Sequence, residues 1–136
     1  MWRIKINYFG YSRTRKISIY RLGHTRTSQG IILAFDLTDK YSFENLTIWL
    51  EGIKNYNSNN KPIVLFGNKS DCKEERKVSE EEARKFVKEK GLINYFENSY
   101  KENINIKEGF FEISNHIYIN DPSFKEGLDL RKGNNN

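Results

Sequence analysis

Hydrophobic and polar residues alternate near the start of the chain. Residues 2–8 carry an apolar side chain at every second position, and the alternation resumes over residues 16–20 after a link that contains Gly10. A period of two is typical of a strand with one buried face. We therefore expect residues 2–22 to form a β-hairpin with a loose turn, whose basic side chains mostly face solvent.

Three more strands are predicted further along the chain. Residues 30–36 and 62–67 are short, mainly apolar runs, which is the pattern of parallel strands covered on both faces. A shorter strand is expected over residues 93–97. Such a sheet needs helices on its two faces, so helical segments should separate these strands.

Helical spacing is present in the segments that follow each strand. Apolar residues recur at every third or fourth position over residues 42–56 and 105–117, which predicts two helices, the second of them capped at its start. A third helix lies between them. Ser79 and Glu82 have the spacing of a capping box at its start, and Gly91 is suited to its end.

The order of these elements predicts an α/β fold. A hairpin is followed by three strand–helix units, which implies a parallel sheet with right-handed crossovers and ligands at the carboxyl ends of the strands. We expect one domain over residues 1–120. Residues 121–136 are polar and without periodicity, and we expect them to be a disordered tail.

Composition narrows the class of protein. The 136 residues and 16.1 kDa fit one domain, and the single cysteine, Cys72, allows no internal disulfide and suits a reducing compartment. No apolar run reaches the roughly 18 residues that span a bilayer. The chain also lacks a signal-peptide pattern and a terminal Cys that could be prenylated. We expect a cytoplasmic protein without a covalent lipid anchor at its C-terminus.

The positive charge is concentrated at the start of the chain. The net charge is +5, yet residues 1–30 contain seven basic residues and no acidic one. A basic hairpin with aromatic side chains could bind nucleic acid or an anionic membrane. However, the alternation places Trp2 and Tyr8 on the apolar side, so we expect these rings to belong to the core instead.

Two polar loops follow predicted strands. Asn68-Lys69-Ser70-Asp71 comes after one strand and Ser99-Tyr100-Lys101 after the next. These loops resemble the NKxD and SAK motifs of Ras-superfamily GTPases. Residues 36–39, together with Ser42-Phe43 and Trp49-Leu50, look particularly like the Rab branch. The resemblance spans about residues 30–119, with the hairpin as a fainter extension, and it implies a partial small-GTPase fold with three layers.

The resemblance implies a guanine-binding role for these loops. Asp71 would accept two parallel hydrogen bonds from the ring N–H and the exocyclic amine of guanine, a pair of donors that adenine lacks. Asn68 would brace the base and the neighbouring loops, and Lys69 would lay its aliphatic stem on the ring. Ser99 and Lys101 would support the far side of the pocket.

Tyr100 departs from the family pattern, which usually has Ala between the Ser and the Lys. The contact that the resemblance implies at Tyr100 is from a backbone N–H to the guanine oxygen. A larger side chain can keep this contact, although it crowds the base.

The phosphate-handling residues of the family are not recognisable. The 136 residues contain no GxxxxGK[ST] sequence, and residues 20–24 stand where a Rab has WDTAGQ. Arg21 cannot hold Mg²⁺ as the family's Asp does, and residues 24–29 are shorter than the usual second switch. We therefore expect weak or no binding of GTP or GDP, with an affinity of about 1 mM or weaker, no Mg²⁺, no catalytic residue and no hydrolysis.

The resemblance also implies a gap in the sheet. In the family fold the first strand lies at the centre, between the strands that correspond to residues 16–22 and 30–36. We expect its loss to leave unpaired backbone groups unless the two strands pair or another chain fills the slot, and hence a marginal fold.

Three other functions stay open. The chain could be an interaction module that binds Rab-type trafficking proteins without a nucleotide cycle, in keeping with an ancestral role in vesicle trafficking. It could bind nucleic acid or an anionic surface through its basic hairpin, which we consider the weaker candidate. It could also be a non-functional remnant of a small GTPase, the product of a pseudogene.

Overall fold

The computed structural model describes residues 6–9, 27–56 and 61–122. These ranges exclude the second strand of the predicted hairpin, all seven basic residues of positions 1–30 and the predicted tail from residue 123 onward. They also exclude Arg21 and residues 24–26, which are half of the segment that corresponds to the second switch.

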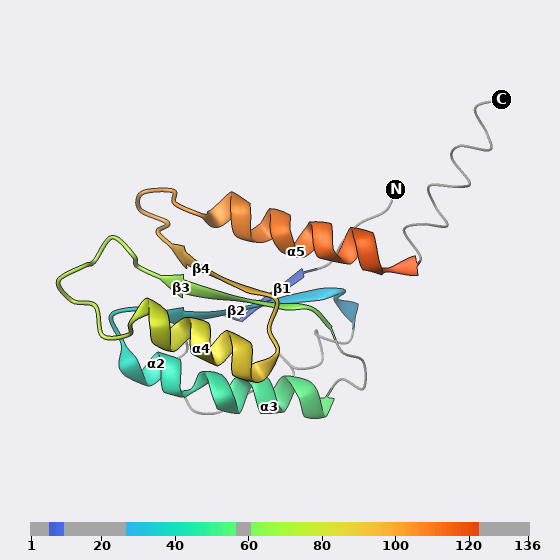
Figure 1. The fold of residues 1–136 in the computed structure, drawn as a ribbon, viewed down its shortest axis with the longest axis horizontal. Helices are drawn as coiled ribbons and strands as arrows, with labels where there is room; N and C mark the ends of the chain where they lie inside the picture. The colour runs from blue at the N-terminus through green and yellow to red at the C-terminus, as the bar shows by residue number, and fades with distance from the viewer. Residues whose placement is uncertain (1–5, 10–26, 57–60, 123–136) are drawn as a thin grey trace.

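The described strands form one parallel sheet. They are β1 (Ile6–Phe9), β2 (Gly30–Asp36), β3 (Ile63–Asn68) and β4 (Asn94–Asn98). They lie side by side in the order β1-β2-β3-β4, and every neighbouring pair is parallel (Figure 1). The predicted α/β class is confirmed, and the strands predicted over residues 30–36, 62–67 and 93–97 are found within one residue of their expected bounds.

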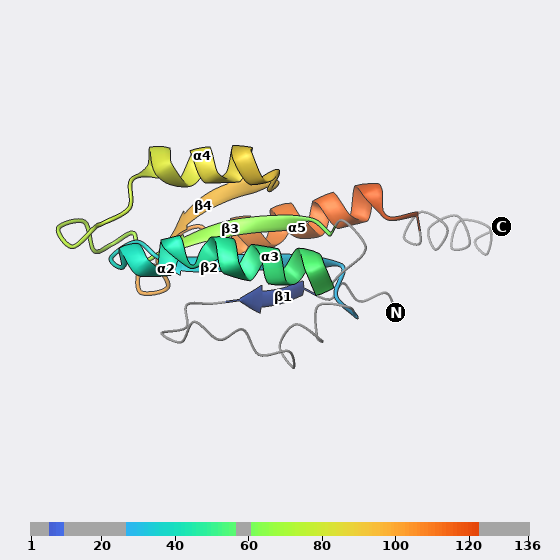
Figure 2. The same cartoon turned by 90° about the horizontal axis from the view of Figure 1, so that it is seen from below.

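The first strand pairs differently from our expectation. β1 lies parallel to β2, with Ile6 opposite Gly30 and Phe9 opposite Leu33 (Figure 2). The predicted gap next to residues 30–36 is therefore wrong, because the chain's own first strand fills it. Alternation predicts that a segment is a strand, but the partner of that strand depends on contacts far away in the sequence.

Helices cover both faces of the sheet. α2 (Lys40–Glu44), α3 (Leu46–Tyr56) and α4 (Glu80–Lys90) lie on one face, and α5 (Ile106–Asn120) is the one described helix on the other (Figures 1 and 2). None of the helices among the described residues has the length and apolar character to cross a membrane.

The helix predicted over residues 42–56 is divided into α2 and α3. The break lies at Asn45, the C-cap of α2, whose backbone N–H bonds to the carbonyls of Phe43 and Tyr41. The apolar spacing is continuous across the break, because α2 and α3 bury the same side against the sheet. For this reason the pattern alone did not reveal it.

The predicted ends of α4 are confirmed, whereas the predicted cap of α5 is not. Ser79 and Glu82 form both hydrogen bonds of the capping box, and Gly91 ends the helix with φ of 69°. Asn105, in contrast, makes no side-chain cap bond to α5 and has φ of 59°. Its amide instead donates to the carbonyl of Glu97 at 2.9 Å, which ties the start of α5 to β4.

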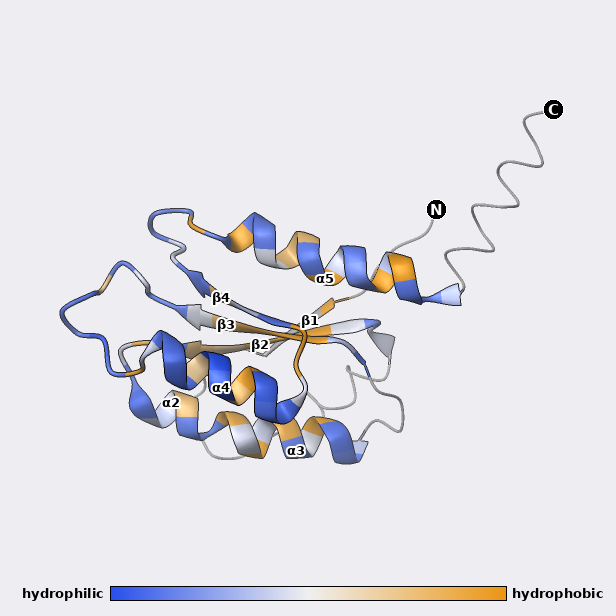
Figure 3. Ribbon diagram, viewed as in Figure 1, coloured by the Kyte–Doolittle hydropathy of each residue, from blue (hydrophilic) through white to orange (hydrophobic). Residues whose placement is uncertain are grey.

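Two hydrophobic cores lie on the two faces of the sheet. In Figure 3 hydrophobic residues colour much of the central strands and parts of the helices on both faces. Alternate residues of β2 and β3 point into each core, since successive side chains of a strand face opposite sides. The core beneath α2, α3 and α4 includes Leu33, Phe35, Leu65, Trp49, Leu50, Ile53, Phe86 and Tyr95. The core beneath α5 consists of Ile32, Ala34, Val64, Phe66, Ile113 and Ile117.

Candidate functional site

The carboxyl ends of β2, β3 and β4 lie together at one edge of the molecule (Figure 1). Their last residues are in register, with Asp36 opposite Asn68 and Asn68 opposite Asn98. Because the three strands are parallel, the loops that follow them leave the sheet at the same edge, as expected for ligand sites in α/β folds. The residues predicted for the base site are all in or beside these loops.

Asp71 and Ser99 are in direct contact. The Ser99 hydroxyl donates to Oδ1 of Asp71 at 2.9 Å and accepts a bond from the backbone N–H of Glu102 at 3.0 Å. The backbone N–H of Ser70 also bonds to the carbonyl of Asn98 at 3.0 Å, which joins the two loops a second time. The structure thus brings the two predicted motifs together.

The contact with Ser99 keeps Asp71 charged. The hydrogen bond from Ser99 is the main reason that the pKa of Asp71 is lowered from its ordinary value of 3.8, and the positive charge of Lys101 adds to the effect. A carboxylate offers about four lone-pair sites, of which Ser99 uses one on Oδ1 and the Cys72 thiol, 3.7 Å away, uses one on Oδ2. Asp71 can therefore accept further hydrogen bonds at neutral pH.

Lys69 forms an ion pair that the sequence analysis did not anticipate. Its Nζ lies 2.7 Å from Oδ2 of Asp36, whose side chain is almost completely buried. Burial raises the pKa of Asp36, but the bonds from Lys69 and Thr38 outweigh it and lower the pKa overall. The order of the predicted strands could have indicated this pair, since Asp36 ends one strand and Lys69 follows the neighbouring strand.

Asn68 and Tyr100 differ in exposure. Asn68 is half-buried at the end of β3, and its carbonyl accepts a bond from the backbone N–H of Leu37 at 2.9 Å, linking it to the loop after β2. Tyr100 is exposed in a loop that is closed by backbone bonds between Ser99 and Ile104. Lys101 is exposed in the same loop.

A polar network behind the loops connects the segment after β3 with β4. Nη1 of Arg76 donates to Oε1 of Glu97 at 2.8 Å, and Nη2 donates to the other carboxylate oxygen. The buried Tyr95 hydroxyl donates to Glu97 at 2.7 Å. Tyr95 passes so close to Gly67 that a Cβ there would lie 2.6 Å from the hydroxyl oxygen, so the residue before Asn68 must be small.

Among residues 6–9, 27–56 and 61–122, no three His, Cys, Asp or Glu side chains form a group that could hold a metal ion. Asp36, the carboxylate that ends β2, already faces the ammonium of Lys69.

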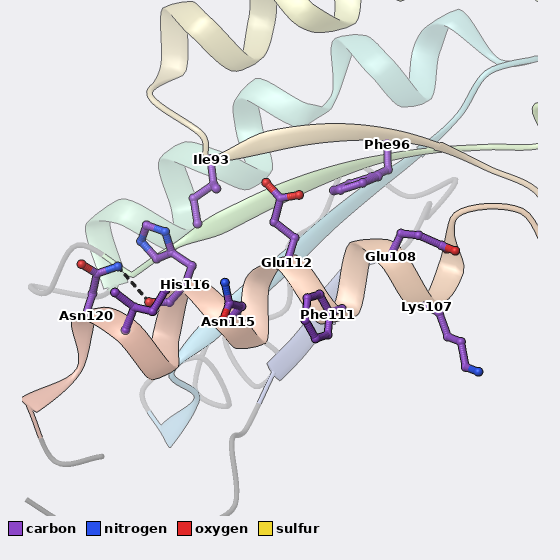
Figure 4. Close-up of a pocket in the computed structure, with 10 residues that line it drawn as sticks. Ile93, Phe96, Lys107, Glu108, Phe111, Glu112, Asn115, His116 and Asn120 are labelled. Atoms are coloured by element: carbon purple, nitrogen blue, oxygen red, sulfur yellow. Dashed lines mark hydrogen bonds between the residues drawn. The ribbon is translucent and has the colours of Figure 1, made fainter. Parts of the chain in front are cut away.

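A hollow lies away from these loops, between α5 and β4 (Figure 4). Its volume is about 910 Å³, and Phe111, with 73% of its surface exposed, lies on its α5 wall. None of the six residues predicted for the base site lines it. The lining residues are Ile93, Phe96, Lys107, Glu108, Phe111, Glu112, Asn115, His116, Ile119 and Asn120.

Comparison with known proteins points to one family. Residues 15–119 match the sequence profile described as the Ras family. GTP-binding protein ypt2 of Schizosaccharomyces pombe is 33% identical over 115 residues, which cover 85% of this chain and 57% of the relative. Ras-related protein Rab-13 of Bos taurus is 34% identical over 133 residues, covering 98% and 63% respectively. The chain thus spans about three-fifths of the length of these relatives.

Proposed function

Because the chain belongs to the Ras family, we propose that it binds the guanine base of a nucleotide through the loops that follow β3 and β4. The observation that carries this proposal is the contact between Asp71 and Ser99, which joins the two loops at 2.9 Å and holds a charged carboxylate at the carboxyl edge of the sheet.

The chemistry of Asp71 favours guanine over adenine. Guanine presents a ring N–H and an exocyclic amine side by side, and one carboxylate can accept both bonds. Adenine presents a ring nitrogen acceptor in place of the N–H, which leaves the carboxylate facing a lone pair. A site with a buried or fixed polar group discriminates strongly against a ligand that cannot pair with it.

We propose further that the 136 residues bind nucleotide weakly and do not hydrolyse it. They contain no GxxxxGK[ST] sequence, and Arg21 stands where the resemblance implies a Mg²⁺-binding Asp. The base alone offers a few hydrogen bonds and a stacked lysine, which supports an affinity of about 1 mM or weaker. GTP and GDP would then bind loosely and without Mg²⁺.

The cellular role that we propose follows from the Rab resemblance. A Rab-like chain would act in the cytoplasm, in vesicle trafficking, through contacts with trafficking proteins. With phosphate contacts absent, those contacts would not follow a nucleotide cycle.

The test is an NMR titration of the ¹⁵N-labelled chain with GMP, GDP and AMP, each with and without Mg²⁺. We expect GMP and GDP, but not AMP, to shift the amide signals of residues 68–71 and 99–101, with no effect of Mg²⁺. Equal responses to GMP and AMP would contradict guanine recognition. Micromolar binding of GDP that requires Mg²⁺ would contradict the proposed loss of phosphate handling.

Asp71→Asn sharpens the test because it changes one acceptor into a donor. We expect the variant to lose its response to GMP and to respond to XMP, in which a C2 carbonyl replaces the guanine amine. Glu74→Gln is the matched control, since it changes an exposed carboxylate in the same loop and should leave the GMP response intact. An unchanged GMP response in Asp71→Asn would refute the assigned role.

A further inference from the structure

The carboxylate of Asp36 is held rigidly. Its Oδ1 accepts bonds from the backbone N–H of Thr38 at 2.8 Å and from the Thr38 hydroxyl at 2.7 Å. Its backbone N–H donates to the hydroxyl of the buried Ser42 at 2.9 Å. The side chain of Asp36 is therefore fixed by its own loop before any contact with another strand is considered.

The remaining oxygen of Asp36 faces the neighbouring loop. Oδ2 lies 2.7 Å from Nζ of Lys69, and the side chains of the pair are exposed to very different degrees, 9% for Asp36 and 58% for Lys69. A buried carboxylate thus anchors the tip of an exposed lysine. The Lys69 side chain as a whole stays more than half exposed at the carboxyl edge, where a ligand can contact it.

Lys69 is also constrained at its backbone. Its φ is 66°, in the left-handed region that costs about 1–2 kcal/mol per residue for an L-amino acid. Asp36 and Asn68 are opposite each other in adjacent strands, so the Lys69 side chain crosses from the end of β3 to the end of β2. The stem is held at both ends.

We propose that Asp36 is a positioning residue that pre-arranges the stem of Lys69 as a flat support for the guanine ring. This inference rests on the proposed base site. A free lysine loses much rotamer freedom when a ligand orders it, and anchoring its tip in advance avoids that loss on binding. Asp36 itself need not touch the base.

The competing explanation is that Asp36 only shapes the turn at the end of β2. Two variants separate the explanations. Asp36→Asn keeps an oxygen for the bonds from Thr38 and removes the negative charge that holds Lys69. Thr38→Val removes the hydroxyl bond within the turn and leaves the carboxylate facing Lys69.

The experiment follows both variants in the full chain by NMR, with GMP as the probe. In the free protein, the two ε-protons of ¹³C-labelled Lys69, assigned by loss of the signal in Lys69→Arg, should have distinct shifts because the stem is immobile. We expect Asp36→Asn to merge these shifts and to weaken GMP binding about threefold to tenfold. Thr38→Val should keep the distinct shifts and bind GMP within a factor of two of the wild type.

Three other results would contradict the inference, and each identifies the step that fails. Distinct ε-proton shifts in Asp36→Asn would mean that Asp36 does not hold Lys69. Merged shifts with unchanged GMP affinity would mean that the anchoring has no role in binding. If the wild-type chain does not bind GMP, the base-site proposal fails and this inference fails with it, whereas distinct wild-type shifts would still establish the anchored lysine.

Discussion

Glu97 accepts hydrogen bonds from three residues, two of them at its carboxylate and one at its backbone carbonyl. It accepts bonds from Arg76 and from the buried Tyr95 hydroxyl, and its own carbonyl accepts the Asn105 amide. Burial raises the pKa of Glu97, but the bonds from Arg76 and Tyr95 outweigh this and lower it from the ordinary value of 4.5. The charged form of Glu97 is therefore favoured in the folded chain.

This balance predicts a pH-dependent stability. Because the pKa of Glu97 is lower in the folded chain than in the unfolded chain, its charged form stabilises the fold above pH 4.5, and the contribution is lost as the pH falls through the lower folded-state pKa. We expect Glu97→Gln to lower the free energy of unfolding by about 1–2 kcal/mol at pH 7 and by less at pH 3. Urea unfolding at several pH values measures this.

The matched control is Glu80→Gln, which removes an ion pair with Arg84 that is about half exposed on both sides. Exposed pairs of this kind contribute little to stability. We therefore expect the unfolding curve of Glu80→Gln to stay close to that of the wild type at both pH values. A Glu97→Gln effect that does not shrink in acid would argue against the charged contact.

At the scale of elements, α5 approaches the sheet through a glycine. A Cβ on Gly109 would lie 2.3 Å from two ring carbons of Phe66, which is buried in β3. The Phe66 ring is itself packed edge-on against Phe96 and Phe110, so it has little space to move. The close contact of α5 with β3 thus depends on the absence of a side chain at this position.

Gly109→Ala should therefore destabilise the chain even though alanine is the better helix former. We expect the free energy of unfolding to fall by about 1–3 kcal/mol, because overpacking a filled core outweighs the helix preference of roughly 1 kcal/mol. Denaturant midpoints measure the change. In the double variant Gly109→Ala/Phe66→Leu, the smaller side chain should relieve the clash, and strictly additive effects would contradict the assigned contact.

The sequence predicted elements where local signals were strong. A few consecutive residues were enough to predict β2 and β3 from their apolar runs and the start of α4 from its capping box. The break at Asn45 and the side chain of Asn105 were not predictable in this way. Asn45 interrupts a helix without interrupting its apolar stripe, and Asn105 bonds to a strand rather than to its own helix.

In the base site, too, some contacts were predictable from local sequence and others were not. Asp71 and Ser99 were predicted from two motifs, and the parallel register of β3 and β4 brings them into contact. The pairing of Lys69 with Asp36 was missed, because no spacing in the sequence links residues that meet only through adjacent strands. The roles of the six predicted residues in binding remain predictions.

At the scale of the whole molecule, the position of β1 makes residues 6–9 part of the described sheet. Without β1, the edge of β2 beside it would lose its strand partner, and Ile6 would no longer pack against the core beneath α5. An unpaired strand edge favours association with other chains. The N-terminal strand should therefore matter for stability and solubility.

Deletion of residues 1–9 tests this. We expect the melting temperature to fall by about 5 °C or more and light scattering to increase on heating, because backbone pairing and apolar burial are lost together. Truncation after Pro122 is the control, since it leaves all the described strands and helices in place. Equal melting temperatures of the full chain and the chain that lacks residues 1–9 would count against a stabilising β1.

The strand order also bears on how the chain is assembled. The described strands stand in the sheet in the order in which they are translated, each beside the one made just before it. Every new strand can dock on a completed neighbour as it leaves the ribosome, and domains do fold as their N-terminal parts emerge. Contacts between successive units also keep loop closures short, which favours rapid folding. The sheet can thus grow in one direction during synthesis, from β1 to β4.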